Sequence, residues 1–168
     1  MKKIRKFVFE TNSSSSHSIT LGDLDSFRKD RYGLKSCIDE NNNLVLKGGE
    51  FGWYLEDDEG AETKVNYVAV ALTYYYEAAK DNEENYYGFT LDEINNIIEL
   101  FKEVLREETD AEVVFNFKVG WEDSYIDHQS IDMIADEIKG KNDSELKEFF
   151  YNFIFNENSI LIIDNDNH

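Results

Sequence analysis

The sequence predicts an α+β fold, with about four helices and a mixed or antiparallel sheet. Segments rich in β-branched and aromatic residues lie near both ends of the 168-residue chain, and helical patterns fill its middle. Strands and helices do not alternate strictly, which disfavours a doubly wound parallel sheet. Hydrophobic residues make up 41% of the chain, enough for a core, and the length fits a single compact domain.

The N-terminal part of the chain predicts two β-hairpins. Residues 3–9 and Ser18–Leu21 are rich in residues that favour strands, and the polar segment between them would be a long hairpin loop. Residues 23–31 predict one or two helical turns. A second hairpin is expected from residues 36–39 and 43–47, because asparagines between them tolerate left-handed turn positions.

Helical patterns dominate the middle of the chain, after a glycine-rich loop or irregular strand at 48–60. Residues 62–80 carry apolar side chains at helical spacing, so one face of this helix is expected to be buried. The apolar positions are Val65, Val68, Ala69, Leu72, Tyr75, Tyr76 and Ala79. Thr90 and Glu93 form a capping box that opens a second helix. Its apolar positions are Ile94, Ile97, Ile98, Phe101, Val104 and Leu105.

The C-terminal third predicts a strand, two helices and a last strand. Apolar and polar residues partly alternate over 111–119, which indicates a strand with one buried face. Ser130 is a candidate cap for a helix over 131–139. Ser144–Phe155 predicts another helix, and Ser159–Ile163 predicts the last strand.

The charge of the chain is strongly negative and unevenly distributed. The formal net charge is −19, yet residues 1–35 hold eight basic and four acidic side chains. We therefore divide the single domain into a basic hairpin region (1–35), an acidic body (36–163) and a polar tail (164–168). An acidic field repels nucleic-acid phosphates and attracts basic surfaces, so direct nucleic-acid binding is not expected. The acidity could also serve solubility alone.

Cysteine usage and hydropathy predict a cytoplasmic protein. Cys37 is the sole cysteine, which excludes an intramolecular disulfide and a cysteine-based zinc site. No run of apolar residues is long enough to span a membrane, and the basic N-terminus lacks the apolar region of a signal peptide. We expect no membrane association and no cofactor. The oligomeric state is left open.

The first segment that could carry chemistry is E-T-N-S-S-S-S-H-S at residues 10–18. A nucleophilic serine needs a base within hydrogen-bond reach, which makes Ser16 and His17 candidate catalytic residues. A serine-rich loop can also hold an anion with its hydroxyls and amides, so Asn12 and Ser13–Ser15 are candidate ligand contacts. The simplest interpretation is a loop whose side chains bond to its own backbone. These candidates comprise Asn12, Ser13, Ser14, Ser15, Ser16 and His17.

The second segment is D-S-Y-I-D-H-Q-S at residues 123–130, between a predicted strand and a predicted helix. Asp127 and His128 are candidate catalytic residues, and Tyr125 and Ser130 are candidate ligand contacts. Two histidines with Asp127 would make a plausible transition-metal triad, although nothing in the spacing demands it. A helix-capping loop with a hydrogen-bonded histidine explains the same residues without chemistry.

Three blocks of the sequence resemble a known group of proteins. R-K-F-V-F-E-T-N-S-S-S-S-H-S-I at 5–19, Y-I-D-H-Q-S at 125–130 and F-I-F-N-E-N-S-I-L-I-I-D-N-D at 153–166 are similar to blocks in uncharacterised phage and prophage proteins of the Firmicutes type. The resemblance implies a phage context and a bacterial host cell. It also implies that the three blocks belong together. It carries no catalytic role.

Two functional interpretations follow. The first is an acidic, anti-CRISPR-like antagonist of host defence that occupies the basic nucleic-acid-binding surface of a host protein. The acids expected to make that contact are Glu83, Glu84, Asp92, Glu93, Glu99, Glu103, Glu107 and Glu108. The alternative is a small enzyme, or a nucleotide- or anion-binding protein, with a Ser/His/Asp pocket built from residues 11–18 and 123–130. The first interpretation ranks ahead because it rests on a measured property of the chain.

Overall fold

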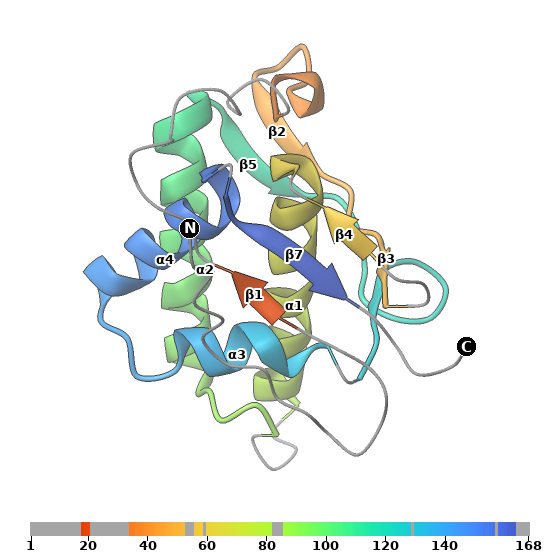
Figure 1. Ribbon diagram of the computed structural model, residues 1–168, viewed down its shortest axis with the longest axis vertical. Helices are drawn as coiled ribbons and strands as arrows, with labels where there is room; N and C mark the ends of the chain where they lie inside the picture. The colour runs from red at the N-terminus through yellow and green to blue at the C-terminus, as the bar shows by residue number, and fades with distance from the viewer. Residues whose placement is uncertain are drawn as a thin grey trace.

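The computed structural model describes residues 18–20, 34–52, 56–58, 60–81, 86–128, 130–156 and 158–163, with the backbone alone at 18–20 and 56–58. Figure 1 shows the arrangement of the elements. The strands are β1 (Ser18–Thr20), β2 (Asn43–Leu46), β3 (Glu50–Phe51), β4 (Glu56–Asp58), β5 (Glu112–Phe115), β6 (Tyr125–Ile126) and β7 (Ile160–Ile163). The helices are the 3-10 helix η3 (Leu34–Cys37) and α1 (Ala61–Lys80), α2 (Leu91–Thr109), α3 (Asp132–Ile138) and α4 (Asp143–Phe155).

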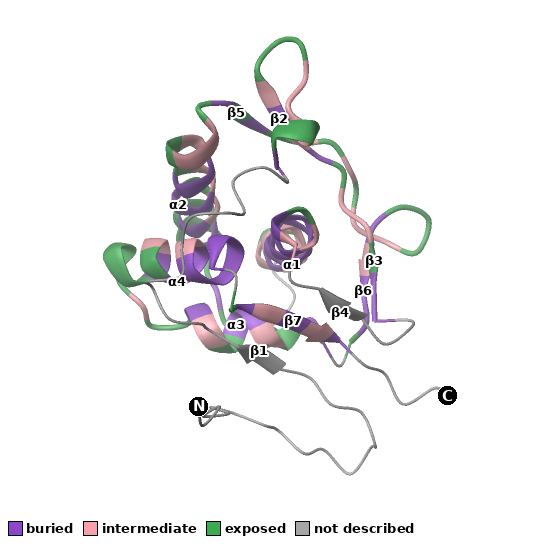
Figure 2. Ribbon diagram, turned by 45° about the horizontal axis from the view of Figure 1, so that its top comes forward, coloured by how far each residue is buried: buried purple, intermediate pink, exposed green. Residues whose placement is uncertain are grey.

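Helix α1 lies in the middle of the other elements (Figure 2). Its residues are buried almost continuously from Lys64 to Leu72, including Tyr67, and Tyr75 is buried one turn further on. The expectation of a single buried face was therefore wrong for the first half of this helix. The physical reason is that α2 and α4 cover one side of α1, while strands lie on its other sides (Figure 2), so no side of this half is left to water.

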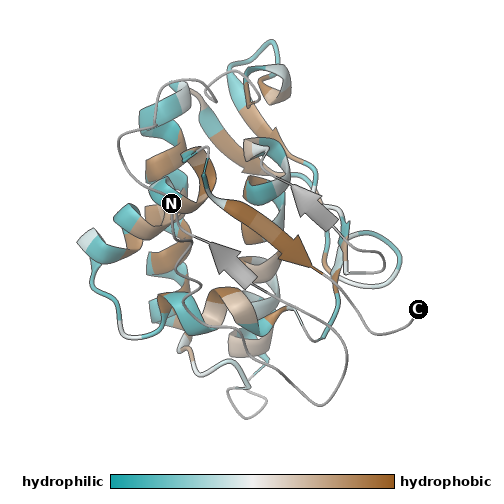
Figure 3. Cartoon of the chain, viewed as in Figure 1, coloured by the Kyte–Doolittle hydropathy of each residue, from teal (hydrophilic) through white to brown (hydrophobic). Residues whose placement is uncertain are grey.

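The strands form three small sheets rather than one. β7 lies between β1 and β4, antiparallel to both, whereas β2–β5 and β3–β6 are parallel pairs. The α+β class with four α-helices in the described ranges is confirmed, and the pairing is mixed. β7 is apolar along its whole length (Figure 3), and Leu161 and Ile163 are buried.

The first predicted hairpin lies largely outside the described residues, and the second is only partly formed. Residues 3–9 and 23–31 lie outside the described residues, and Ser18–Thr20 pairs with β7. Of the second hairpin, the turn forms, with Asn42 at a φ of 61°, and Ile38 makes a single bridge to Leu44. The first half of the predicted first strand is instead the end of η3, and β2 pairs with β5. The sequence could not reveal this parallel partner, because it lies far along the chain.

The helix ends show which capping predictions hold. Thr90 and Glu93 form the predicted capping box of α2, and Asn142 with Glu145 forms a second one that opens α4. The prediction that Ser130 caps α3 was wrong, since α3 starts without a side-chain cap bond. The buried hydroxyl of Tyr75 instead forms hydrogen bonds with the first turn of α3. It donates to the carbonyl of Ile131 and accepts a 3.1 Å hydrogen bond from the amide of Ala135.

Helices α2 and α4 pack through aromatic side chains and are joined at the surface by charge. The rings of Phe101 and Phe150 meet edge to face with centroids 5.3 Å apart, and both residues are buried. At the rim, the Lys147 ammonium lies 2.7 Å from Glu103 and 3.4 Å from Glu107. None of the helices within the described ranges is long and apolar enough to cross a membrane.

Candidate functional site

The second predicted segment belongs to a loop that is ordered by its own hydrogen bonds. The Gly120 amide donates to the Ser124 carbonyl at 2.8 Å, and the Asp123 carboxylate accepts from the Lys118 amide at the same distance. The Ser124 amide in turn donates to the Lys118 carbonyl at 3.0 Å. Residues 118–124 therefore form a tight turn whose tip carries Trp121.

This turn is fixed to the glycine pair before β3. Gly49 donates its amide to the Ser124 hydroxyl at 3.2 Å, and Ser124 is buried. At Gly48 the backbone has a φ of +71°, and an added Cβ would meet the Ser124 side chain and lie 2.8 Å from Phe117 Cγ. Only glycine fits there, so the close contact between Gly48 and Ser124 holds the turn against the start of β3.

Asp127 and His128 form a pair at the edge of the buried region. The Asp127 carboxylate lies 3.2 Å from His128 Nδ1, and the histidine side chain is 79% exposed. Asp127 is buried, and its carbonyl accepts the amides of Ser130 and Ile131 at 2.9 and 3.1 Å. A carboxylate that orients an imidazole is one part of a hydrolytic triad, so the pair could support a base if a nucleophile lay beside it.

The other predicted contacts of this segment differ in their exposure. Ser130 is fully buried, and its carbonyl accepts a 2.7 Å hydrogen bond from the Tyr67 hydroxyl. Its side chain is therefore closed off from solvent in this structure. Tyr125 is partly exposed and stacks on Trp121, with ring centroids 4.3 Å apart. It stays available as a contact residue.

The candidates of the first segment lie outside the described residues. They are Asn12, Ser13, Ser14, Ser15, Ser16 and His17. The last residue of that segment, Ser18, pairs with Ile162 in β7. The next residue of β7, Ile163, and Asp127 both lie against Gly52. A Cβ added at Gly52 would be 3.3 Å from Ile163 Cγ2 and 2.6 Å from Asp127 Cβ. The sequence blocks at 5–19, 125–130 and 153–166 thus each contribute residues near the C-terminal end of β7.

The acids predicted to contact a partner are partly engaged within the protein. Glu99 lies 3.0 Å from Lys102, and Glu103 and Glu107 share Lys147. Glu93 closes the capping box of α2. The remaining predicted acids differ in placement: Asp92 is exposed, Glu108 is partly buried, and Glu83 and Glu84 lie outside the described residues. The outer face of α2 is therefore less free to bind a partner than its sequence indicates.

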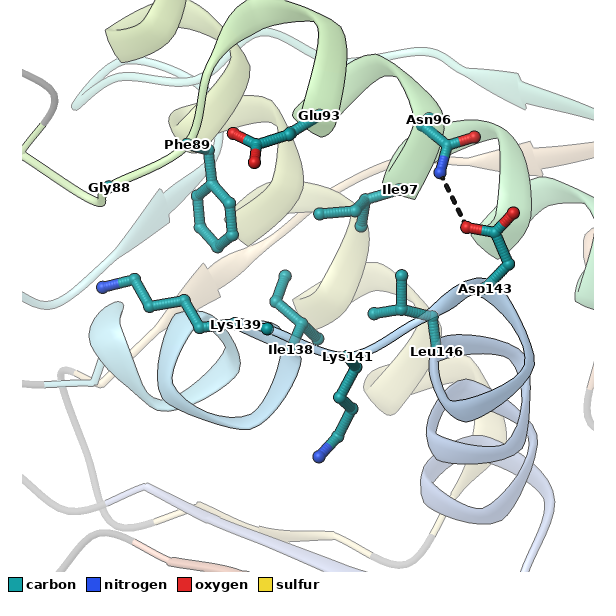
Figure 4. A pocket seen from close by; sticks show the side chains of 11 residues that line it. Gly88, Phe89, Glu93, Asn96, Ile97, Ile138, Lys139, Lys141, Asp143 and Leu146 are labelled. Atoms are coloured by element: carbon teal, nitrogen blue, oxygen red, sulfur yellow. Dashed lines mark hydrogen bonds between the residues drawn. The ribbon is translucent and has the colours of Figure 1, made fainter.

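A shallow cleft lies where the start of α2 faces the connection between α3 and α4 (Figure 4). Its floor contains Phe89, Ile97, Ile138 and Leu146. Its rim carries Lys139 and Lys141 but also Glu93 and Asp143, and Asn96 donates a 3.1 Å hydrogen bond to Asp143. Because the rim mixes both signs of charge, the cleft has no clear preference for an anion or a cation.

An exposed aromatic residue was missed by the sequence reasoning. Trp121 is 71% exposed, and its partner Tyr125 lies beside Tyr74 of α1, whose hydroxyl is 3.4 Å from the Ser124 carbonyl. Burial and the nearby Tyr125 hydroxyl raise the pKa of Tyr74. The available signal was the local sequence G-W-E-D. A tryptophan directly flanked by glycine and two acids does not belong to an apolar run and is therefore a candidate surface residue.

The described part of the chain contains no cluster of three or more histidine, cysteine or acidic side chains that could hold a metal ion. No protein-family model matches the chain, and no curated protein or solved structure gives a match. Neither a family nor an activity can therefore be taken from a relative, and the resemblance to phage-type proteins stays a prediction.

Proposed function

We propose that this protein is an acidic interaction protein that binds a basic surface on a partner protein. The observation that carries the proposal is the imbalance of charge left at the surface. Lys80, Lys102, Arg106 and Lys147 are held in ion pairs with acids. Exposed acids with no ion pair among the described residues include Asp92, Glu122, Asp136 and Glu148.

This distribution favours a basic protein over other classes of partner. A net charge of −19 repels the phosphates of DNA and RNA, whereas the surfaces that bind those phosphates carry the complementary sign. Ion pairing inside the protein neutralises three lysines and Arg106, so an approaching partner meets mostly carboxylates. The partner we propose is therefore a protein that itself binds nucleic acid, and the phage-type resemblance supports a host protein.

The test is competition between this protein and DNA for the same basic site. Fluorescently labelled duplex DNA is bound to each member of a panel of nucleic-acid-binding proteins, and the unlabelled acidic protein is added. Displacement of the DNA is expected for at least one member, more strongly at low salt. If the acidic protein binds none of them at low salt, or binds the DNA itself, the proposal is wrong.

A charge-reduced variant makes the test specific. It combines Asp92→Asn, Glu122→Gln, Asp136→Asn and Glu148→Gln. A control combines Asn95→Gln and Asn116→Gln, which alter exposed neutral side chains and leave the charge unchanged. The charge-reduced variant should displace DNA less well than the wild type, and the control should match the wild type. Equal displacement by all three would contradict a charge-driven contact.

A further inference from the structure

Five partly or largely exposed aromatic side chains from three separate segments lie as two ring pairs on either side of Tyr74, and we call this set the aromatic strip. Its members are Trp121, Tyr125, Tyr74, Tyr87 and Tyr86. Trp121 stacks on Tyr125 with centroids 4.3 Å apart, and Tyr86 meets Tyr87 edge to face at 5.0 Å. Tyr74 and its neighbour Tyr75 in α1 lie between the two pairs. The Tyr74 hydroxyl is 3.4 Å from the carbonyl of Ser124, the residue before Tyr125, and the Tyr75 ring packs on Tyr87.

The two ends of the strip are open to solvent, and its middle is supported by the core. Trp121 is 71% and Tyr86 77% exposed, whereas Tyr74, Tyr87 and Tyr125 are partly buried. Tyr87 packs on the fully buried Tyr75, with centroids 4.6 Å apart. The aromatic rings are thereby held in place before any partner arrives, which lowers the entropy cost of binding.

Carboxylates lie near several members of the strip, and Lys139 also lies near one of these carboxylates, Asp132. Glu122 follows Trp121 and is exposed, Asp127 lies near Tyr125, and Asp132 lies near Tyr87. Burial, with Asp132 as the next cause, raises the pKa of Tyr87 to about 12. The same Asp132 has a pKa raised by burial and by the neighbouring Asp136. A cation placed on the strip would therefore meet aromatic faces and negative charge together.

We propose that the aromatic strip is the docking surface for arginine side chains of the basic partner. The inference rests on the proposed function and specifies where and how the partner binds. A guanidinium stacks flat on Trp or Tyr rings and can still bond a carboxylate with its edge, whereas a lysine ammonium is more strongly hydrated and cannot stack. Tryptophan, tyrosine and arginine are also the residues that dominate protein interfaces.

Other occupants fit the strip less well. A single-stranded nucleic acid would stack on the rings, but the carboxylates of Glu122 and Asp132 would repel its phosphates. A neutral sugar could also stack on Trp121, but it would gain nothing from the negative charge around the strip. The charge complementarity therefore selects an arginine-rich protein surface, and a sugar or a nucleic acid becomes an outcome of the test.

The test compares two synthetic probe peptides of equal length and charge, one with arginine alternating with glycine and the other with lysine alternating with glycine. Affinities for the full-length protein are measured by calorimetry at physiological salt. The arginine peptide should bind about threefold to tenfold more tightly than the lysine peptide, the range expected for one or two cation–π contacts. Trp121→Ala and, separately, Tyr86→Ala should each reduce this preference, while circular dichroism confirms that the variants fold.

Matched controls separate the strip from the charge. Val114→Ala removes an apolar side chain that is 41% exposed on β5 and should leave both affinities unchanged. Glu122→Gln should lower the affinity for the arginine peptide more than Glu40→Gln, which removes the same charge from the turn before β2.

If both peptides bind equally well to the wild type and to Trp121→Ala, the strip is not the docking surface, but the proposed function stands. If neither peptide binds, the proposed function itself fails. Binding of a neutral oligosaccharide or of single-stranded DNA to the strip, lost in Trp121→Ala, would overturn the inference in favour of that ligand.

Discussion

Replacing Tyr75 by phenylalanine tests how the centre of the fold supports the functional surface. Tyr75 is buried in α1, and its hydroxyl bridges the first turn of α3 by donating to Ile131 and accepting from Ala135. The ring also supports Tyr87 of the aromatic strip. Tyr75→Phe keeps that ring and removes only the hydroxyl, so its effect isolates the two hydrogen bonds.

The expected loss of stability follows from those two bonds. Each buried hydrogen bond contributes about 0.5–1.5 kcal/mol, so the pair would contribute about 1–3 kcal/mol. The Ile131 carbonyl and the Ala135 amide are four residues apart, however, and can bond to each other once the hydroxyl is gone. Because this backbone hydrogen bond would replace the two that are lost, we expect the free energy of unfolding to fall by only about 1–2 kcal/mol.

Urea denaturation followed by far-ultraviolet circular dichroism measures this cost, with the slope m checked for constancy. Tyr76→Phe is the matched control, because Tyr76 lies on the same helix and its hydroxyl makes no hydrogen bond among the described residues. The control should change the free energy of unfolding by less than about 0.5 kcal/mol. If Tyr75→Phe behaves like the control, the hydroxyl does not fasten α3 to α1.

Three further predictions concern stability. Gly48→Ala should lower the free energy of unfolding by about 2–4 kcal/mol in urea, because the new methyl group meets Ser124 at a positive φ, and adding Ser124→Gly should restore part of the loss. Asn142→Ala should cost about 1 kcal/mol in a thermal melt, because it removes the capping box of α4. Asp132→Asn should stabilise the protein at neutral pH. Since burial and Asp136 raise the pKa of Asp132 in the folded state, the destabilisation is complete above that pKa and vanishes as the pH falls below the ordinary pKa of an aspartate. A pH series of urea titrations in which Asp132→Asn gives no gain at neutral pH would contradict this assignment.

Local signals in the sequence predicted local structure well. The capping box at Thr90 and the apolar face of α2 depend on residues three or four positions apart, and both are confirmed. Pairings between distant segments were not predictable in the same way. The partner of β2 is β5, and the group that bonds the start of α3 is Tyr75, 56 residues before the carbonyl that accepts its hydrogen bond. The sequence placed Ser130 at the start of α3 as its cap, but the hydrogen bonds at that helix start come from the buried Tyr75.

In the candidate site, too, contacts between neighbouring residues were predictable from the sequence and contacts between distant segments were not. Sequence reasoning selected Asp127 and His128, which do form a pair, because they are neighbours in the chain. It missed the aromatic strip, because its members come from α1, from the turn before α2, and from β6 with the loop before it. Each tyrosine alone looks like a core or loop residue. The helical pattern placed Tyr75 and Tyr76 on the buried face and left Tyr74 out, but both Tyr74 and Tyr76 are only partly buried, which the pattern alone could not reveal.

The proposal of a basic partner is tested most directly by the salt dependence of its binding. The affinity of the protein for a partner identified by DNA competition is measured by calorimetry over a series of salt concentrations, alongside the charge-reduced variant. We predict that the affinity falls steeply as salt rises and that the variant shows a smaller slope, because fewer carboxylates face the partner. An affinity that is unchanged by salt, or equal slopes for the wild type and the variant, would contradict binding through the acidic surface.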